Sequence, residues 1–135
     1  TLRGRRIAVL GLAFKPDSDD VRDSPALDIA RRLAAEGARV VATDPAAVET
    51  ARPLAPALDY RSGVIEAVTA ADAVLVLTEW RQYRELDPVA LATLAGGRIV
   101  IDGRLCLDAQ RWQSAGWRYL APGRITDRSR ALLGV

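Results

Sequence analysis

The sequence predicts an α/β fold: a Rossmann-like, doubly wound and mainly parallel sheet of five to six strands flanked by helices. Short apolar runs alternate with amphipathic stretches along the chain, which is the pattern of successive βα units. The first run, residues 6–13, is almost wholly apolar, as expected of a strand covered on both faces. The 135 residues are enough for one domain with a substantial core.

The first βα unit has the clearest boundaries. A strand is predicted over 6–13, and Ser24-Pro25 opens a helix with the serine as N-cap and the proline in the first turn. Gly37 is the predicted C-cap, and residues 39–43 form the second strand. The apolar side of the helix consists of Leu27, Ala30, Leu33 and Ala34.

The middle of the chain is less regular. Asp44-Pro45 is a turn, and residues 46–56 give no clear pattern because prolines interrupt them. The elements expected after this segment are a short edge strand over 58–60, a helix over 64–71, a central strand over 73–78, a helix over 88–94 with Asp87 as N-cap, a strand over 98–101 that leads into Asp102-Gly103-Arg104, a helix over 109–115, and a final strand over 117–120.

Composition excludes several classes of function. The formal net charge is only +2, the arginines are scattered and no nucleic-acid motif is present, so no nucleic-acid partner is expected. No apolar run approaches the roughly 18 residues of a membrane span, so the expected location is cytoplasmic. The chain has 0 histidines, which removes Ser-His-Asp catalysis and histidine metal ligation. A metal site and an intramolecular disulfide are not expected, since Cys106 is the only cysteine.

The loop after the first strand is the most unusual segment. It runs from Phe14 to Asp23, where ordinary βα loops have two to six residues, and no G-x-G-x-x-G pattern follows Gly11. The loop contains Lys15, the only lysine among 19 basic residues. Lys15 and Arg22 lie where a strand meets a helix N-terminus, which favours contact with a phosphate. Asp17 and Asp19 are interpreted as solvated residues that favour the nearby helix N-terminus.

Three segments resemble the UDP-glucose/GDP-mannose dehydrogenase family. They are G-L-A-F-K-P-D-S-D-D-V-R-D-S-P-A at 11–26, V-L-V-L-T-E-W at 74–80, and I-D-G-R at 101–104. All three follow or include predicted strand ends, in the family's order and at similar spacing. The resemblance extends over nearly the whole chain and identifies residues 1–135 as a C-terminal, sugar-nucleotide (UDP)-binding domain. The family's N-terminal NAD-binding domain, which carries the catalytic cysteine, is absent from this chain.

The resemblance implies an activity and specific roles. Family members oxidise the C6 alcohol of a nucleotide sugar with NAD, and UDP-glucose is favoured here as the substrate. The implied substrate contacts are Phe14, Lys15 and Arg104, and the implied NAD contact is Arg22. The expected partners are the UDP-sugar, the N-terminal domain and, in the full-length enzyme, a second subunit of a homodimer. No catalytic residue is expected in this chain, so the fragment alone should be inactive.

Some residues near the motifs receive structural interpretations. Cys106 is expected to be a buried packing residue, and Trp112 and Trp117 to pack in the core or at an interface. Asp44 ends the second strand, where it could contact a ribose, although capping of the next helix is preferred. Glu79 and Trp80 are assigned a hydrogen bond and packing rather than substrate contact. Leu105 departs from the family, because many bacterial members have Asn there.

Other functions are kept open. One is a stand-alone nucleotide-binding or regulatory module without catalysis, and another is the same domain of a GDP-mannose or UDP-N-acetylhexosamine dehydrogenase. The start at Thr1 without a methionine favours an excised domain over a stand-alone module. A NAD-binding domain in its own right is disfavoured by the missing glycines.

Overall fold

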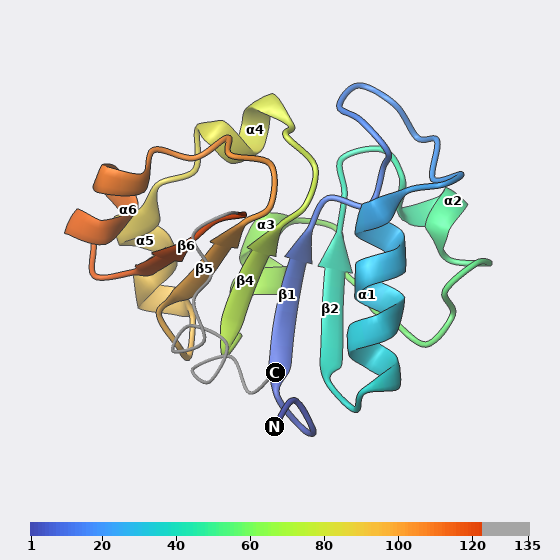
Figure 1. The fold of residues 1–135 in the computed structure, drawn as a ribbon, viewed down its shortest axis with the longest axis horizontal. Coiled ribbons are helices and arrows are strands. Elements are labelled where there is room, and N and C mark those ends of the chain that lie inside the picture. The colour runs from blue at the N-terminus through green and yellow to red at the C-terminus, as the bar shows by residue number, and fades with distance from the viewer. Residues whose placement is uncertain (123–135) are drawn as a thin grey trace.

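The computed structural model describes residues 1–122 and shows a six-stranded sheet with helices on both faces (Figure 1). The strand order is β3-β2-β1-β4-β5-β6, and every neighbouring pair is parallel. This is the Rossmann order, in which the direction of winding reverses between β1 and β4. The predicted fold class is confirmed.

The first half of the sheet consists of three strands and the helices that connect them. These are β1 (Arg6–Leu10), α1 (Pro25–Ala35), β2 (Arg39–Thr43), α2 (Val48–Ala51), β3 (Asp59–Tyr60) and α3 (Val64–Val68). The Ser24 side chain accepts a hydrogen bond from the Leu27 amide at 3.3 Å, so the predicted N-cap is confirmed. Gly37 has a φ of +99° just after α1, which is the left-handed conformation expected of a helix-ending glycine.

The second half consists of β4 (Ala73–Val76), α4 (Arg81–Arg84), α5 (Pro88–Leu94), β5 (Ile99–Asp102), α6 (Ala109–Ser114) and β6 (Arg118–Leu120). The Asp87 carboxylate accepts from the Val89 amide at 2.9 Å, which confirms the predicted cap of α5. Helix α4 was not predicted, because it is a single turn without a capping side chain.

One strand and one helix end earlier than expected, because a residue with a positive φ follows each of them. The strand predicted over 6–13 ends at Leu10, since Gly11 has a φ of +103° and turns the chain out of the sheet. The helix predicted over 64–71 ends at Val68, and Ala70 has a φ of +63°, which no helix accommodates.

The core lies in two layers, one on each face of the sheet. Alternate residues of the central strands pack with α1 and α2 on one face, and with α3, α5 and α6 on the other. Strands β1 and β4 are apolar on both faces for this reason. No helix among residues 1–122 is long and apolar enough to cross a membrane.

Candidate functional site

The carboxyl ends of β1, β4 and β5 meet at one edge of the sheet, at the upper side of Figure 1. In open α/β sheets ligands bind outside this edge, at the point where the strand order reverses. Here that point lies between β1 and β4. We call the edge formed by the carboxyl ends of β1, β4 and β5 the switch-point edge. The three segments singled out from the sequence all end at this edge.

A partly exposed ion pair joins the segments that follow β4 and β5. The Arg104 Nε donates to Glu79 Oε2 at 3.1 Å, and its Nη2 donates to Glu79 Oε1 at 3.3 Å. The Arg104 side chain is 35 % exposed and that of Glu79 is 25 % exposed. The pair is therefore partly shielded from water but open on one side. The expected structural hydrogen bond of Glu79 thus turns out to be a bond to Arg104.

The charge state of Glu79 follows from two opposing effects. Partial burial raises the pKa of the Glu79 carboxyl. Hydrogen bonds from Arg104 and from the Glu79 backbone amide act in the opposite direction and lower this pKa. The positive charges of Arg104 and Arg84 act in the same direction, so the net pKa lies below the usual value. Glu79 is consequently ionised at neutral pH.

Hydrogen bonds to a fully buried carboxylate fix the loop that carries Arg104. Asp102, 0 % exposed, accepts from the Cys106 amide at 3.0 Å and from the Leu107 amide at 2.8 Å. The Tyr119 hydroxyl donates to the same carboxylate at 2.7 Å. These bonds fix the turn from 103 to 107 relative to the sheet. Sequence reasoning placed Asp102 at the strand end but did not assign it this role.

Cys106 behaves as a structural residue. Its thiol is half-buried and lies 3.6 Å from Asp102 Oδ1. Burial, followed by the negative charge of Asp102 and a hydrogen bond to it, raises the pKa of the Cys106 thiol to about 12. At neutral pH the side chain is a thiol rather than a nucleophilic thiolate. Cys106 is therefore half-buried rather than buried as expected, and this environment agrees with a packing role.

Asp44, at the end of β2, connects three segments of the edge. Its Oδ1 accepts from the amides of Ala46 and Ala47, both at 2.8 Å. The predicted capping of the next helix is wrong: these bonds close the turn that precedes α2, and the N-cap of α2 is Ala47, which has no side-chain cap. The Asp44 Oδ2 accepts from the amides of Leu12 at 2.8 Å and Ala13 at 3.0 Å, which the sequence did not predict.

The Asp44 carboxylate has no free oxygen lone pair that could accept a hydrogen bond from a ribose. The residue is only 5 % exposed, and besides the four amides its carboxylate accepts from the Trp80 indole at 3.2 Å. In a dinucleotide-binding turn the amides after the first strand would face a pyrophosphate. In this chain Leu12 and Ala13 donate to Asp44 instead, so the turn does not fit the pyrophosphate of NAD.

The ends of β1 and β4 touch at Gly11 and Thr78. A Cβ on Gly11 would lie 2.6 Å from the Thr78 Cβ, so no larger residue fits. The buried Thr78 hydroxyl donates to the Ala13 carbonyl at 2.8 Å. Because Ala13 directly precedes Phe14 and Thr78 directly precedes Glu79, this contact brings the first loop next to the Glu79–Arg104 pair.

Phe14 and Lys15 begin the long loop at this position. The Phe14 amide donates to the Asp20 carbonyl at 2.9 Å, which folds the loop back on itself. The Phe14 side chain is nevertheless 48 % exposed, and Lys15 is exposed and makes no hydrogen bond within residues 1–122. An apolar ring and a cation are thus presented to solvent at the edge that also carries Arg104.

Arg22 lies at the other end of the loop. Its side chain is 85 % exposed and forms two hydrogen bonds to the Asp20 carboxylate, at 3.0 and 2.9 Å. Hydrogen bonds from the Arg22 side chain and then its amide hold the pKa of Asp20 at about 2. The structure therefore does not bring Arg22 into contact with Phe14, Lys15 or Arg104.

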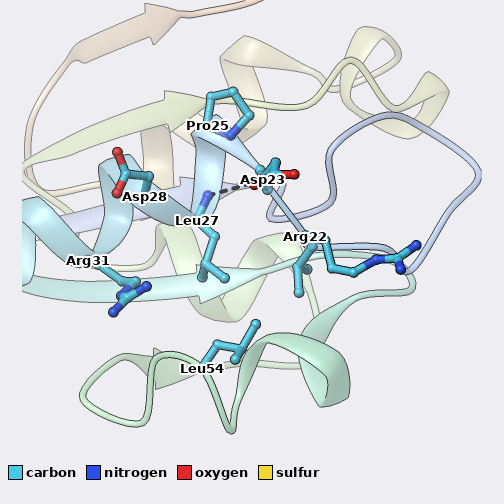
Figure 2. Close-up of a pocket in the computed structure, with 9 residues that line it drawn as sticks. Arg22, Asp23, Pro25, Leu27, Asp28, Arg31 and Leu54 are labelled. Atoms are coloured by element: carbon cyan, nitrogen blue, oxygen red, sulfur yellow. Dashed lines mark hydrogen bonds between the residues drawn. The ribbon is translucent and has the colours of Figure 1, made fainter.

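A cavity of about 530 Å³ lies beside Arg22, between the first turn of α1 and Leu54 (Figure 2). Asp23, Asp28 and Arg31 also line it. Figure 2 shows the Arg22 guanidinium directed away from the cavity centre. The lining mixes both signs of charge with apolar groups, so it shows no preference for an anion.

Trp112 and Trp117 form an aromatic pair next to β6. Trp112 and Trp117 are buried and pack edge to face, with ring centroids 5.1 Å apart. The Trp117 indole donates to the Pro88 carbonyl at 2.9 Å. Both tryptophans belong to the core, as the first of the two expected interpretations stated.

Residues 8–109 match the model of the UDP-glucose/GDP-mannose dehydrogenase family, UDP binding domain. The chain belongs to this family. Members of the UDP-glucose/GDP-mannose dehydrogenase family with high similarity include the UDP-glucose 6-dehydrogenase TuaD of Bacillus subtilis, 42 % identical over 129 residues. The UDP-glucose 6-dehydrogenase AglM of Haloferax volcanii is 47 % identical over 103 residues.

The match covers much of this chain but a small part of each relative. The alignment with TuaD includes 95 % of this chain and 28 % of the relative, and that with AglM includes 76 % and 24 %. A solved UDP-glucose dehydrogenase from Pyrobaculum islandicum, 37 % identical, superimposes with a TM-score of 0.72 over 90 % of this chain and 26 % of its own. The chain thus spans about a quarter of the length of these family members.

Proposed function

We propose that residues 1–135 are the UDP-sugar-binding, C-terminal domain of an NAD-dependent enzyme that oxidises UDP-glucose to UDP-glucuronate. The observation that carries the proposal is the pair of cations at the switch-point edge, Lys15 without a hydrogen-bond partner in residues 1–122 and Arg104 anchored by Glu79. The family match over 8–109 supports it. Relatives with the printed name UDP-glucose 6-dehydrogenase support the choice of sugar.

Phe14, Lys15 and Arg104 are the proposed substrate contacts. A nucleoside diphosphate carries negative charge on two adjacent phosphates, and charge-assisted hydrogen bonds to such groups are roughly twice as strong as neutral ones. Lys15 offers a compact charge and Arg104 a planar fork. The half-exposed Phe14 offers an apolar surface beside Lys15, at the sheet edge that also carries Arg104.

Arg22 is proposed to contact NAD. When bound, NAD supplies the hydride acceptor of the oxidation. The turn after β1 does not fit its pyrophosphate, so the dinucleotide belongs to the proposed N-terminal domain. Arg22 suits a contact from outside this chain because it is 85 % exposed at the far end of the loop. The homodimer of the full-length enzyme and the cytoplasmic location stay predictions.

A ligand comparison tests the proposal. The 135-residue chain is titrated calorimetrically with UDP, uridine, GDP and NAD. We expect saturable binding of UDP, and binding of uridine weaker by at least about tenfold, because uridine lacks the phosphates that Lys15 and Arg104 would bind. Tighter binding of GDP would assign the domain to a GDP-sugar enzyme. Equal binding of uridine and UDP would contradict the proposed phosphate site.

The competing function is a nucleotide-binding module without catalysis. Under our proposal the isolated chain makes no NADH from UDP-glucose, because it lacks both the dinucleotide turn and a reactive cysteine. NADH formation returns when the chain is part of the full-length enzyme. A full-length protein that binds UDP but never reduces NAD would favour the module instead.

A further inference from the structure

The contact between Glu79 and Arg104 uses only one side of the guanidinium. A guanidinium has five N–H groups, arranged so that it can face two bidentate partners. The Glu79 carboxylate takes Nε and one N–H of Nη2, at 3.1 and 3.3 Å. The second fork, formed by Nη1 and the other N–H of Nη2, is not used by Glu79.

Within residues 1–122 no other group accepts a hydrogen bond from Arg104. The side chain is 35 % exposed, so the unused fork has access to solvent. Its geometry matches two oxygens of a phosphate, which arginine binds in the same bidentate manner as a carboxylate. Glu79 and a phosphate can therefore bind Arg104 simultaneously, on different edges.

Both partners of this contact start from fixed backbone. Glu79 follows Thr78, which is buried and bonded to the Ala13 carbonyl at 2.8 Å. Arg104 lies in the turn that the buried Asp102 holds through the Cys106 and Leu107 amides. A long arginine side chain would otherwise sample many rotamers, and ordering it on binding has an entropic cost.

We propose that Glu79 is a positioning residue: it holds the Nε edge of Arg104 and thereby presents the second fork to a phosphate of the nucleoside diphosphate. This inference rests on the proposed function, because it requires Arg104 to bind the substrate. Glu79 itself does not touch the ligand. Its effect is to order Arg104 before the ligand arrives, which strengthens binding without adding a contact.

The neighbouring helix supplies a matched control. Glu85 forms a similar contact, in which Arg81 Nε donates to Glu85 Oε1 at 3.0 Å. That pair lies on the surface of α4, where its side chains are 88 % and 64 % exposed. Glu79→Gln and Glu85→Gln make the same chemical change, but only the first alters the ordering of Arg104.

The experiment measures UDP affinity by calorimetry for the unsubstituted chain, E79Q, E85Q, R104A and the double variant E79Q/R104A. We expect R104A to weaken binding about tenfold and E79Q about threefold to tenfold, while E85Q binds as the unsubstituted chain. The double variant should bind no more weakly than R104A alone, since Glu79 acts only through Arg104. Thermal unfolding of E79Q checks that the chain remains folded.

A second measurement follows Arg104 directly and needs no ligand. In ¹⁵N NMR spectra the Arg104 Nε–H signal should be slow to exchange in the unsubstituted chain and fast in E79Q. Unchanged exchange would overturn the inference, because Glu79 would then not hold the side chain.

The binding outcomes separate the two claims. If R104A weakens binding while E79Q leaves it unchanged or makes it tighter, the positioning role is wrong and the proposed function survives. Additive losses in the double variant would also overturn it, since Glu79 would then act independently of Arg104. If UDP does not bind, or R104A binds UDP normally, the proposed substrate contact itself fails and the inference fails with it.

Discussion

The indole N–H of Trp80 donates to the Asp44 carboxylate at 3.2 Å, and both residues are only 5 % exposed. The bond connects the end of β2 with the segment after β4, across the strand that lies between them. The same carboxylate oxygen holds the amides of Leu12 and Ala13. The Asp44 side chain is therefore a buried hydrogen-bond acceptor that connects the first loop with the segment after β4.

Replacing Asp44 should destabilise the chain strongly. Asp44→Asn removes one acceptor and places an NH₂ group against backbone N–H donors, so we expect the free energy of unfolding to fall by about 3 kcal/mol. Urea denaturation measures the change. Glu49→Gln, at a surface pair whose glutamate is 82 % exposed, is the control and should cost less than about 0.5 kcal/mol. Equal effects of the two substitutions would contradict the structural role of Asp44.

Gly11 should tolerate no side chain. It has a φ of +103° and the Thr78 Cβ would lie 2.6 Å from an added Cβ. Gly11→Ala combines backbone strain with overpacking, so a loss of about 3 kcal/mol or more is expected in the free energy of unfolding.

Gly4 is the matched control for this substitution. Its φ of +76° is also left-handed, but nothing lies within 4 Å of an added Cβ. Gly4→Ala should therefore cost about 1 kcal/mol, from backbone strain alone. Similar losses at the two glycines would show that the contact with Thr78 does not matter.

These relationships mark the limit of what the sequence predicts. Local signals were sufficient for β2 and α5, whose observed bounds equal the expected ones. Ser24 and Asp87 cap their helices as predicted, because capping depends only on residues two or three positions away. Helix α4 lacked such a signal.

The hydrogen bonds between side chains at the switch-point edge depend on the order of the strands in the sheet. They could not be derived from local sequence patterns. Asp44 bonds to Leu12, 32 positions away, and Arg104 bonds to Glu79, 25 positions away. One signal does exist: Asp44, Thr78 and Asp102 are polar residues at or just after the ends of apolar strands. In a parallel sheet such residues meet at one edge, which makes them candidates for buried partners.

The Cys106 thiol should react slowly with alkylating reagents. Its pKa is raised to about 12, against roughly 8.5 for a free cysteine, so the thiolate fraction at pH 8 is far smaller than in an unfolded chain. We expect iodoacetamide labelling, followed by mass spectrometry, to be at least about 100-fold slower in the folded chain than in urea. Equal rates in the two states would contradict the half-buried environment of Cys106 and its raised pKa.

Asp59 should contribute to acid sensitivity. Hydrogen bonds from Arg61 act first, burial opposes them, and Arg39 adds to the lowering, so the pKa of Asp59 is about 2 in the folded chain. The unfolded value is roughly 3.9. The folded pKa is depressed, so the stabilisation is present above about pH 4 and is lost as the pH falls towards about 2.

Asp59→Asn tests this linkage. The difference in unfolding free energy between the unsubstituted chain and D59N should be constant near neutral pH and shrink between about pH 4 and pH 2. Urea denaturation at several pH values measures it. A difference that does not change over this range would mean that the pairs with Arg39 and Arg61 do not stabilise the fold.

Binding of UDP at the switch-point edge can be observed residue by residue in a ¹H–¹⁵N NMR titration of the chain with UDP. We predict that the largest shifts occur at the amides of Phe14, Lys15 and Arg104 and at the Arg104 Nε–H, with little change at Arg31, which lines the cavity beside α1. Shifts centred on Arg31 and Leu54 with Lys15 and Arg104 unchanged, or no shifts at millimolar UDP, would show that UDP does not bind at the switch-point edge.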